Sequence, residues 1–131
     1  MLRRSLLAAF LTLSLAGCET TMLGSVAASC ALRTEPTLLP ETLPTAQVGK
    51  QYRVALEVTD APAPVHGIYA SGTQPLPEGL RIEHQDRDSY GFIVGTPTRA
   101  GFYEVQLSAG TYGTQCAGLR ARRIYTLHII E

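Results

Sequence analysis

The stretch "QYRVALEVT" at residues 51–59 decides the fold class of this chain. Apolar side chains occupy every second position, namely Tyr52, Val54, Leu56 and Val58, and the positions between them are polar or small. A period of two residues is typical of a strand with one buried face, because successive side chains on a strand point to opposite sides. The stretch therefore predicts a β-strand that covers a core.

Short segments of the same kind follow along the chain, separated mostly by Gly or Pro. They are "HGIYAS" (66–71), "LRIEH" (80–84), "YGFIVG" (90–95), "GFYEVQLSAG" (101–110) and "RIYTLHII" (123–130). Alternation groups Leu80 with Ile82, Tyr90 with Phe92 and Val94, Tyr103 with Val105 and Leu107, and Tyr125 with Leu127 and Ile129. This spacing predicts an all-β sandwich of about seven strands.

Two segments carry a family resemblance, "LPEGL" (76–80) and "GTPTRAGFYEV" (95–105). They are preceded by "LPTAQVGKQYRVAL" (43–56) and followed by "YTLHII" (125–130). In this order and spacing the segments resemble the immunoglobulin-like domains of bacterial surface proteins, which are relatives of the cadherin-like and dystroglycan-type modules. The resemblance covers about residues 36–131 and implies an immunoglobulin-like Greek-key β-sandwich.

The residues of these motifs have structural roles in the fold. They are Leu76, Pro77, Gly79, Leu80, Gly95, Thr96, Pro97, Gly101 and Tyr103. Pro77 fixes φ and Gly79 permits a positive φ, so "PEG" predicts a tight turn before a strand that starts near Leu80. Tyr103 is a candidate for the tyrosine corner, in which the hydroxyl returns to nearby backbone. In the family these positions mark the fold and not a catalytic centre.

Residues 1–17 are expected to be a signal peptide. Arg3 and Arg4 give a positive start, and residues 6–16 are almost wholly apolar. As a helix this apolar segment reaches only about 16 Å, short of the roughly 30 Å hydrocarbon core of a bilayer. The segment is therefore predicted to be a leader and not a transmembrane span. The paired arginines also allow a twin-arginine signal.

The sequence "LAGC" at 15–18 resembles the lipobox of bacterial lipoproteins. The resemblance implies that the leader is removed and that Cys18 receives fatty acyl chains, such as palmitate, which hold the protein to a membrane. Glu19 follows the lipid-bearing cysteine, and the absence of Asp there favours the outer membrane facing the periplasm over the inner membrane. The alternative is an ordinary secretory leader, cut after Ala16 or Gly17.

The mature chain is expected to have two parts. Residues 18–35 would form the lipidated N-terminus and a short tether, and residues 36–131 the sandwich. The stretch 19–29 shows no clear hydrophobic period, so it is interpreted as a flexible coil.

Cys30 and Cys116 remain as an even pair once Cys18 carries lipid. In the oxidising cell envelope such a pair predicts a disulfide. Two unpaired buried thiols are the alternative. No metal site or cofactor is predicted, because the chain has no CxxC motif and its three histidines are isolated.

Two charged stretches allow more than one interpretation. "EHQDRDS" (83–89) places His84, Asp86 and Asp88 at alternate positions, either as cation ligands or as a solvated turn. "RARR" (120–123) would place Arg120 and Arg122 together, with Arg123 opposite, either to contact an anion or as charges on a solvated edge strand.

The remaining features exclude some classes of function. Lys and Arg number 11 and Asp and Glu number 11, so no general case exists for nucleic acid as a partner. No catalytic residues are predicted, because no nucleophile motif is present. We expect a non-enzymatic lipoprotein of the bacterial cell envelope that binds a protein or a glycan. The alternative is a small accessory subunit of an envelope assembly, such as a secretion, pilus or adhesin system.

Overall fold

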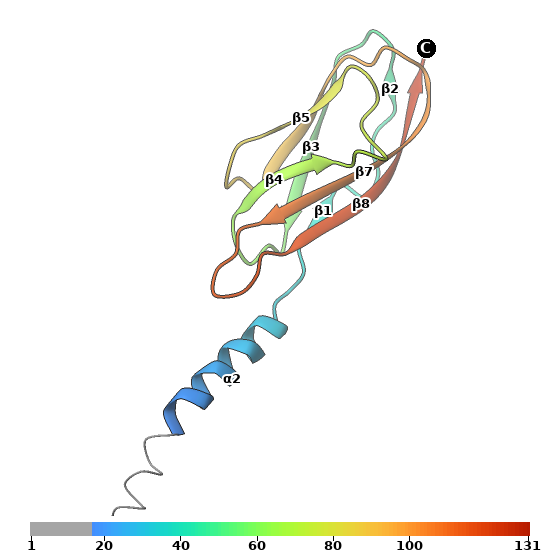
Figure 1. Cartoon of the computed structure of the whole chain (residues 1–131). Coiled ribbons are helices and arrows are strands. Elements are labelled where there is room, and N and C mark those ends of the chain that lie inside the picture. The colour runs from blue at the N-terminus through green and yellow to red at the C-terminus, as the bar shows by residue number, and fades with distance from the viewer. Residues whose placement is uncertain (1–16) are drawn as a thin grey trace, which may run out of the picture. The chain divides into compact units, whose positions relative to one another are not determined.

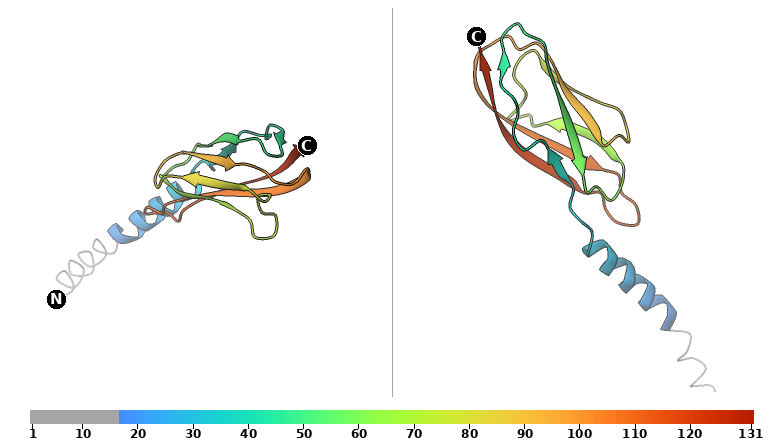
Figure 2. Two further views of the ribbon diagram at one scale, coloured as in Figure 1. Left: turned by 90° about the horizontal axis from the view of Figure 1, so that it is seen from above. Right: turned by 180° about the vertical axis from the view of Figure 1, so that it is seen from behind.

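The computed structural model describes residues 17–131. Within it, Thr34–Glu131 forms one compact unit whose regular elements are all strands. In chain order these are β1 (Thr37–Leu39), β2 (Ala46–Gln47), β3 (Tyr52–Thr59), β4 (Val65–Ala70), β5 (Leu80–His84), β6 (Tyr90–Gly95), β7 (Gly101–Thr111) and β8 (Arg120–Ile130). Figures 1 and 2 show these strands packed in two layers.

Each layer is a four-stranded sheet. One has the order β1-β3-β6-β5 and the other the order β2-β8-β7-β4. Neighbouring strands are antiparallel except β2 and β8, which are parallel. The first order corresponds to strands A, B, E and D of immunoglobulin domains, and β8, β7 and β4 correspond to G, F and C. The predicted all-β sandwich is confirmed.

The core lies between the two sheets. Its largest fully buried side chains include Tyr125, Leu38, Leu56, Ile93, Leu107, Leu127 and Ile129. On β3, Tyr52, Leu56 and Val58 are buried as the alternation predicted, whereas Arg53 and Ala55 are exposed. Burial of a large apolar side chain stabilises a fold by about 1.5–3 kcal/mol, so this alternation helps to hold the two layers together.

On strand β6 the face formed by Tyr90, Phe92 and Val94 points away from the space between the two sheets. Tyr90, Phe92 and Val94 share a face as grouped, but Ile93 is the residue that is fully buried, and Tyr90 is 51% exposed. Residues paired across a sheet lie on the same side, and Ile93 pairs with Val54 on the inward side of β3. The face of β6 that covers the core is therefore decided by its register with β3.

The turn at "LPEGL" has the predicted geometry. The amide of Leu80 donates to the carbonyl oxygen of Pro77 across 3.1 Å, and Gly79 has φ +94°. Farther along, the hydroxyl of Tyr103 donates to the carbonyl oxygen of Arg99 across 3.0 Å, which is the contact of a tyrosine corner. These local bonds set where β5 and β7 start.

The interpretation of residues 19–29 as coil was wrong. Residues Gly17–Ala31 form the helix α2. The segment contains no Pro, and its three Ala, one Met and one Leu favour helix, while its apolar residues follow no period that would have indicated one. Residues 1–16 of the predicted leader and the side chain of Cys18 lie outside what the structure describes. In residues 17–131 no helix combines the length and apolar character needed to span a membrane.

Candidate functional site

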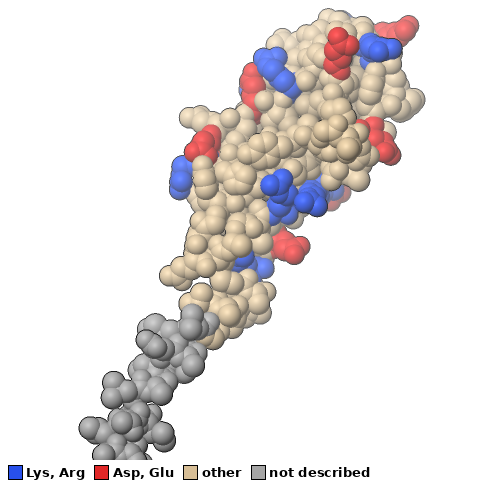
Figure 3. Space-filling view, in the orientation of Figure 1, with Lys and Arg blue, Asp and Glu red and all other residues tan. Residues whose placement is uncertain are grey.

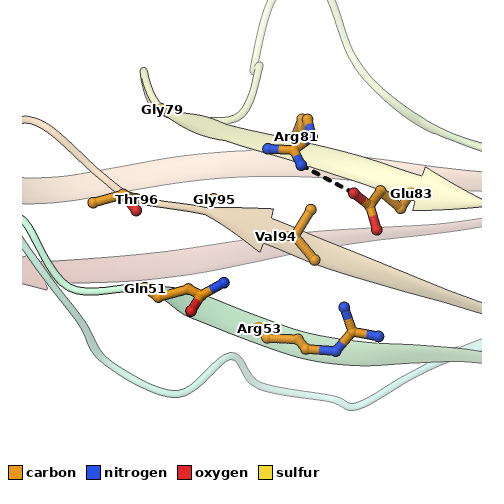
Figure 4. Close-up of a pocket in the computed structure, with 8 residues that line it drawn as sticks. All are labelled: Gln51, Arg53, Gly79, Arg81, Glu83, Val94, Gly95 and Thr96. Atoms are coloured by element: carbon orange, nitrogen blue, oxygen red, sulfur yellow. Dashed lines mark hydrogen bonds and ion pairs between the residues drawn. The ribbon is translucent and has the colours of Figure 1, made fainter.

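The outward face of the β1-β3-β6-β5 sheet carries an ordered row of charged side chains. Strand register places Arg53 of β3 beside Val94 of β6, and Val94 beside Arg81 of β5. Because paired residues lie on the same side of a sheet, the two arginines flank Val94 from both sides. Figure 4 shows these three side chains on their three strands.

The next row adds an aromatic ring. Phe92 of β6 pairs with Ala55 on one side and with Glu83 on the other. The guanidinium carbon of Arg53 lies 4.0 Å from the centroid of the Phe92 ring, which is a cation–π contact. This contact holds the Arg53 side chain against the sheet.

Two adjoining hollows follow these rows. The first, of about 360 Å³, is lined by Gln51, Arg53, Gly79, Arg81, Glu83, Val94, Gly95 and Thr96 (Figure 4). The second, of about 330 Å³, is lined by Arg53, Glu83, His84, Gln85, Asp88, Tyr90 and Phe92. Arg53 and Glu83 line both hollows, so they stand at the boundary between them. We call the two hollows together the β3-β6-β5 face.

The charges on this face are not all neutralised within the molecule. Arg81 and Glu83 form an ion pair of 3.0 Å between exposed side chains, and such pairs contribute little free energy. In the described part of the chain, Arg53 has no carboxylate partner. The guanidinium of Arg53 can therefore donate hydrogen bonds to a ligand while its flat side rests on Phe92.

Tyr90 is an exposed aromatic residue that lines the second hollow. Its hydroxyl donates to Oε1 of Glu57 across 3.1 Å. This hydrogen bond, together with the negative charge of Glu57, raises the pKa of Tyr90 above its ordinary value. The Tyr90 ring is exposed, and the hydrogen bond to Glu57 holds its hydroxyl end in place. Another ring can therefore stack on it.

The structure does not bring His84, Asp86 and Asp88 together. The hydroxyl of Tyr112 donates to Oδ1 of Asp86 across 2.7 Å, and Nε2 of His84 bonds to the carbonyl oxygen of Asp88 across 2.8 Å. Among the residues with described side chains, no group of three His, Cys, Asp or Glu could hold a metal ion. The stretch is a turn held by a hydrogen bond within it and by another to Tyr112, 26 residues from Asp86.

Cys30 and Cys116 are disulfide-bonded, which confirms the predicted bridge and excludes two unpaired thiols. Cys116 lies in the connection between β7 and β8, as expected if it sits between the last two strands.

The sequence did not predict a binding surface at the β3-β6-β5 face. Of the residues that line it, Gly79, Gly95 and Thr96 were assigned to the fold, and His84 and Asp88 were considered as cation ligands or as part of a solvated turn. The available signal was the outward position of Arg53 in the alternating stretch 51–59 and of Arg81 in 80–84. Phe92 gave no such signal, because the sequence groups it with apolar neighbours. The face exists only after three segments pair side by side.

The sequence itself has no match among family models, and no curated protein matches it. Solved structures do match the fold. The SrpA adhesin from Streptococcus sanguinis is similar with a TM-score of 0.58 and 16% identity, over 74% of this chain and 57% of that one. The sialic acid binding region of the Streptococcus sanguinis SK1 adhesin, bound to 3'sLn, has a TM-score of 0.53 and 14% identity, over 75% and 31%.

An enzyme is among the similar structures as well. An endo-fucoidan hydrolase of glycoside hydrolase family 107 matches with a TM-score of 0.55 and 20% identity, over 78% of this chain but only 15% of that one. At these identities the similarity establishes the fold alone. The chain thus shares a β-sandwich fold with parts of these adhesins and of this hydrolase. It spans 57% of the SrpA chain, 31% of the sialic acid binding region and 15% of the hydrolase.

Proposed function

We propose that this protein is a non-enzymatic glycan-binding module, held to the bacterial cell envelope by lipid on Cys18. The observation that carries the proposal is the β3-β6-β5 face, where Arg53 and Arg81 flank Val94 beside the Phe92 ring. Sugar rings bind through stacking on aromatic side chains and through hydrogen bonds from fixed polar groups. The face offers the exposed ring of Tyr90 for stacking and the polar side chains of two adjoining hollows for hydrogen bonds.

An acidic sugar suits the face best. The guanidinium of Arg53 has donors without a carboxylate partner among the described residues, and a planar guanidinium matches the two oxygens of a carboxylate. The hydroxyl of Thr96 and the amide of Gln51, both lining the first hollow, add donors and acceptors for sugar hydroxyls. That a region of similar fold in a streptococcal adhesin is bound to 3'sLn supports a glycan as the class of ligand.

The arrangement of the polar side chains supports binding without catalysis. Among the described residues, two acidic side chains line the face, Glu83 in both hollows and Asp88 in the second. Glu83 is ion-paired with Arg81, whereas most glycoside hydrolases use one carboxyl group as an acid and a second carboxylate as a base or nucleophile. Nδ1 of His66 bonds to the hydroxyl of Tyr69, and His128 stacks on Phe102 with ring centroids 4.1 Å apart. Neither pairing is that of a base with a serine or cysteine nucleophile.

The lipid anchor is supported by the "LAGC" sequence and by the apolar segment that precedes it. A lipid at Cys18 would place the sandwich at a membrane surface. Growth with labelled palmitate should label the wild-type protein, whereas Cys18→Ala should remain unlabelled. Equal labelling of both would show that Cys18 is not the attachment point.

Binding is tested on an array of acidic and neutral glycans with the full chain and three variants. We expect Arg53→Ala and Phe92→Ala to weaken binding at least about tenfold, which corresponds to about 1.4 kcal/mol. Arg99→Ala removes the same charge from an exposed loop outside the hollows and should bind as the wild type does. Absence of binding to any glycan, or equal losses in Arg53→Ala and Arg99→Ala, would contradict the proposal.

The accessory-subunit alternative has less support, because strand addition needs a long exposed edge. Edge strands β1 and β2 have 3 and 2 residues. Edge strand β5 carries Arg81 and Glu83, and edge strand β4 shifts register between Val65 and Gly67. Short edges, charges and bulges each hinder pairing with another chain.

A further inference from the structure

The opposite sheet holds another hollow with a different chemistry. It lies on the outward face of β4, β7 and β8, has a volume of about 260 Å³ and is lined by Tyr69, Ala70, Ser71, Gln106, Ser108, Arg120 and Arg122. This set of described residues holds two arginines and no acidic side chain. Figure 3 shows neighbouring basic groups over the strands β7 and β8, with acidic groups nearby.

The alternation of β8 separates the arginines of "RARR" as the sequence predicted. Nε of Arg123 donates to the carbonyl oxygen of Leu38 across 2.8 Å, so Arg123 has a structural role. Arg120 and Arg122 point outward together. In the described residues neither of them forms an ion pair.

The interpretation of these arginines as charges on a solvated edge strand agrees with the strand register. β8 pairs with β7 from Arg120 to Ile129, whereas β2 pairs with β8 only at Ile129 and Ile130. Beside Arg120 and Arg122 no strand of the described chain therefore pairs with the other side of β8, and their charges hinder edge pairing there. The same two guanidinium groups have no ion pair in the described chain, so they are also available to an anion.

The small residue opposite Arg122 leaves space for a ligand. Arg122 pairs with Ser108, whereas Arg120 pairs with Gly110, over which the ring of His66 lies. Nη1 of Arg120 donates to Oγ of Ser108 across 3.3 Å, which leaves the hydroxyl hydrogen of Ser108 free to be donated outward. Residues two apart on a strand lie about 6.8 Å from each other, so both guanidinium groups can reach one anion between them.

We propose that this hollow, the β4-β7-β8 hollow, binds a phosphate ester through Arg120, Arg122 and Ser108. A phosphate group offers oxygens in several directions, which two guanidinium forks and a hydroxyl can each engage. A carboxylate would use fewer of these donors. The site is separate from the β3-β6-β5 face, because it lies on the other sheet.

Two sources of phosphate are distinguished by the probes. The full chain, labelled with ¹⁵N, is titrated at constant ionic strength with inorganic phosphate and, separately, with glycerophosphoglycerol, the water-soluble part of a phospholipid headgroup. We expect saturable shifts of the amide signals of Ser108 and Arg122, with a Kd on the order of 1 mM. Tighter binding of the diester indicates a lipid headgroup, and tighter binding of inorganic phosphate indicates a soluble phosphate.

The variants distinguish a specific binding site from a general attraction of anions to basic side chains. Arg120→Gln and Arg122→Gln should each weaken binding about fivefold or more, and the double variant at least about tenfold. Arg99→Gln removes the same charge elsewhere and should stay within about twofold of the wild type. No saturable shift up to about 20 mM of either probe would overturn the proposal. Equal losses in the double variant and in Arg99→Gln, with unchanged melting temperatures, would overturn it as well.

Discussion

The hydroxyl of Tyr125 donates a hydrogen bond of 2.7 Å to the carbonyl oxygen of Pro40, 85 residues earlier in the chain. Tyr52 makes a similar bond of 2.8 Å to the carbonyl oxygen of Pro44. Both rings are buried in the core, and both acceptors belong to the segment that carries the chain from β1 in one sheet to β2 in the other. Two core tyrosines therefore hold the crossing between the layers.

Removal of the Tyr125 hydroxyl tests this role. Tyr125→Phe keeps the ring and leaves the Pro40 carbonyl without its partner, so we expect a loss of about 1–2 kcal/mol in the free energy of unfolding. Chemical denaturation measures it. Tyr90→Phe removes an exposed hydroxyl and should change stability by less than about 0.5 kcal/mol. Equal effects of the two variants would contradict the prediction.

Alkaline pH should destabilise the fold through the same tyrosines. Burial raises the pKa of Tyr52 and of Tyr125 to about 12, from 10.0. Between about pH 10 and pH 12 the unfolded chain releases these protons while the folded chain keeps them, so stability that is complete below pH 10 is lost as the pH rises.

The size of the alkaline effect is on the order of 2 kcal/mol for each tyrosine at about pH 12. Denaturation midpoints measured from about pH 8 to about pH 12 should fall for the wild type. The double variant Tyr52→Phe and Tyr125→Phe starts from lower stability but should show a shallower fall. Parallel curves for the two proteins would rule out this cause.

Gly79 should not tolerate a side chain. Its φ is +94°, and a Cβ atom there would collide with the backbone carbonyl oxygen of Thr96. We expect Gly79→Ala to destabilise the fold by about 3 kcal/mol, from strained backbone and steric overlap together.

Gly72 provides the matched control for this substitution. A Cβ at Gly72 meets no atom within 4 Å, and its φ is not in the positive range. Gly72→Ala should leave stability within about 0.5 kcal/mol of the wild type, or raise it slightly by restricting the unfolded chain. A thermal melt of both variants compares them, and a Gly79→Ala protein as stable as Gly72→Ala would refute the steric argument.

The bridge between Cys30 and Cys116 should contribute substantially to stability, because it closes a long loop in the unfolded chain. Its removal by Cys30→Ser and Cys116→Ser should cost about 4–5 kcal/mol on the chain-entropy account. Reductant should lower the denaturation midpoint of the wild type to that of the double variant. It should have no effect on the double variant itself, and an effect there would point to another cause.

The sequence predicted the strands better than the surface they build. Tyr52, Leu56 and Val58 were correctly expected on one buried face, because alternation reports which residues of a strand share a side. For β6 alternation could not say which side meets the core. There, Gly91 and Ile93 face inward because they pair with Leu56 and Val54, whose inward positions β3 had already set.

Helix α2 was missed for a related reason. Several of its residues favour helix locally, but its apolar residues do not recur at the helical period, so hydrophobic periodicity does not indicate a helix there. The β3-β6-β5 face was missed because Arg53, Arg81 and Phe92 come from three separate segments of the chain.

The sequence by itself determined the fold class, the turn at Gly79, the tyrosine corner at Tyr103 and the pairing of two cysteines. Each of these depends on local conformational preference or on the chemistry of one residue type. Only the tertiary structure decided which face of β6 is buried and which side chains meet in the hollows of the two sheets. Strand register decides such matters, and register is a property of pairs of strands that no single segment contains.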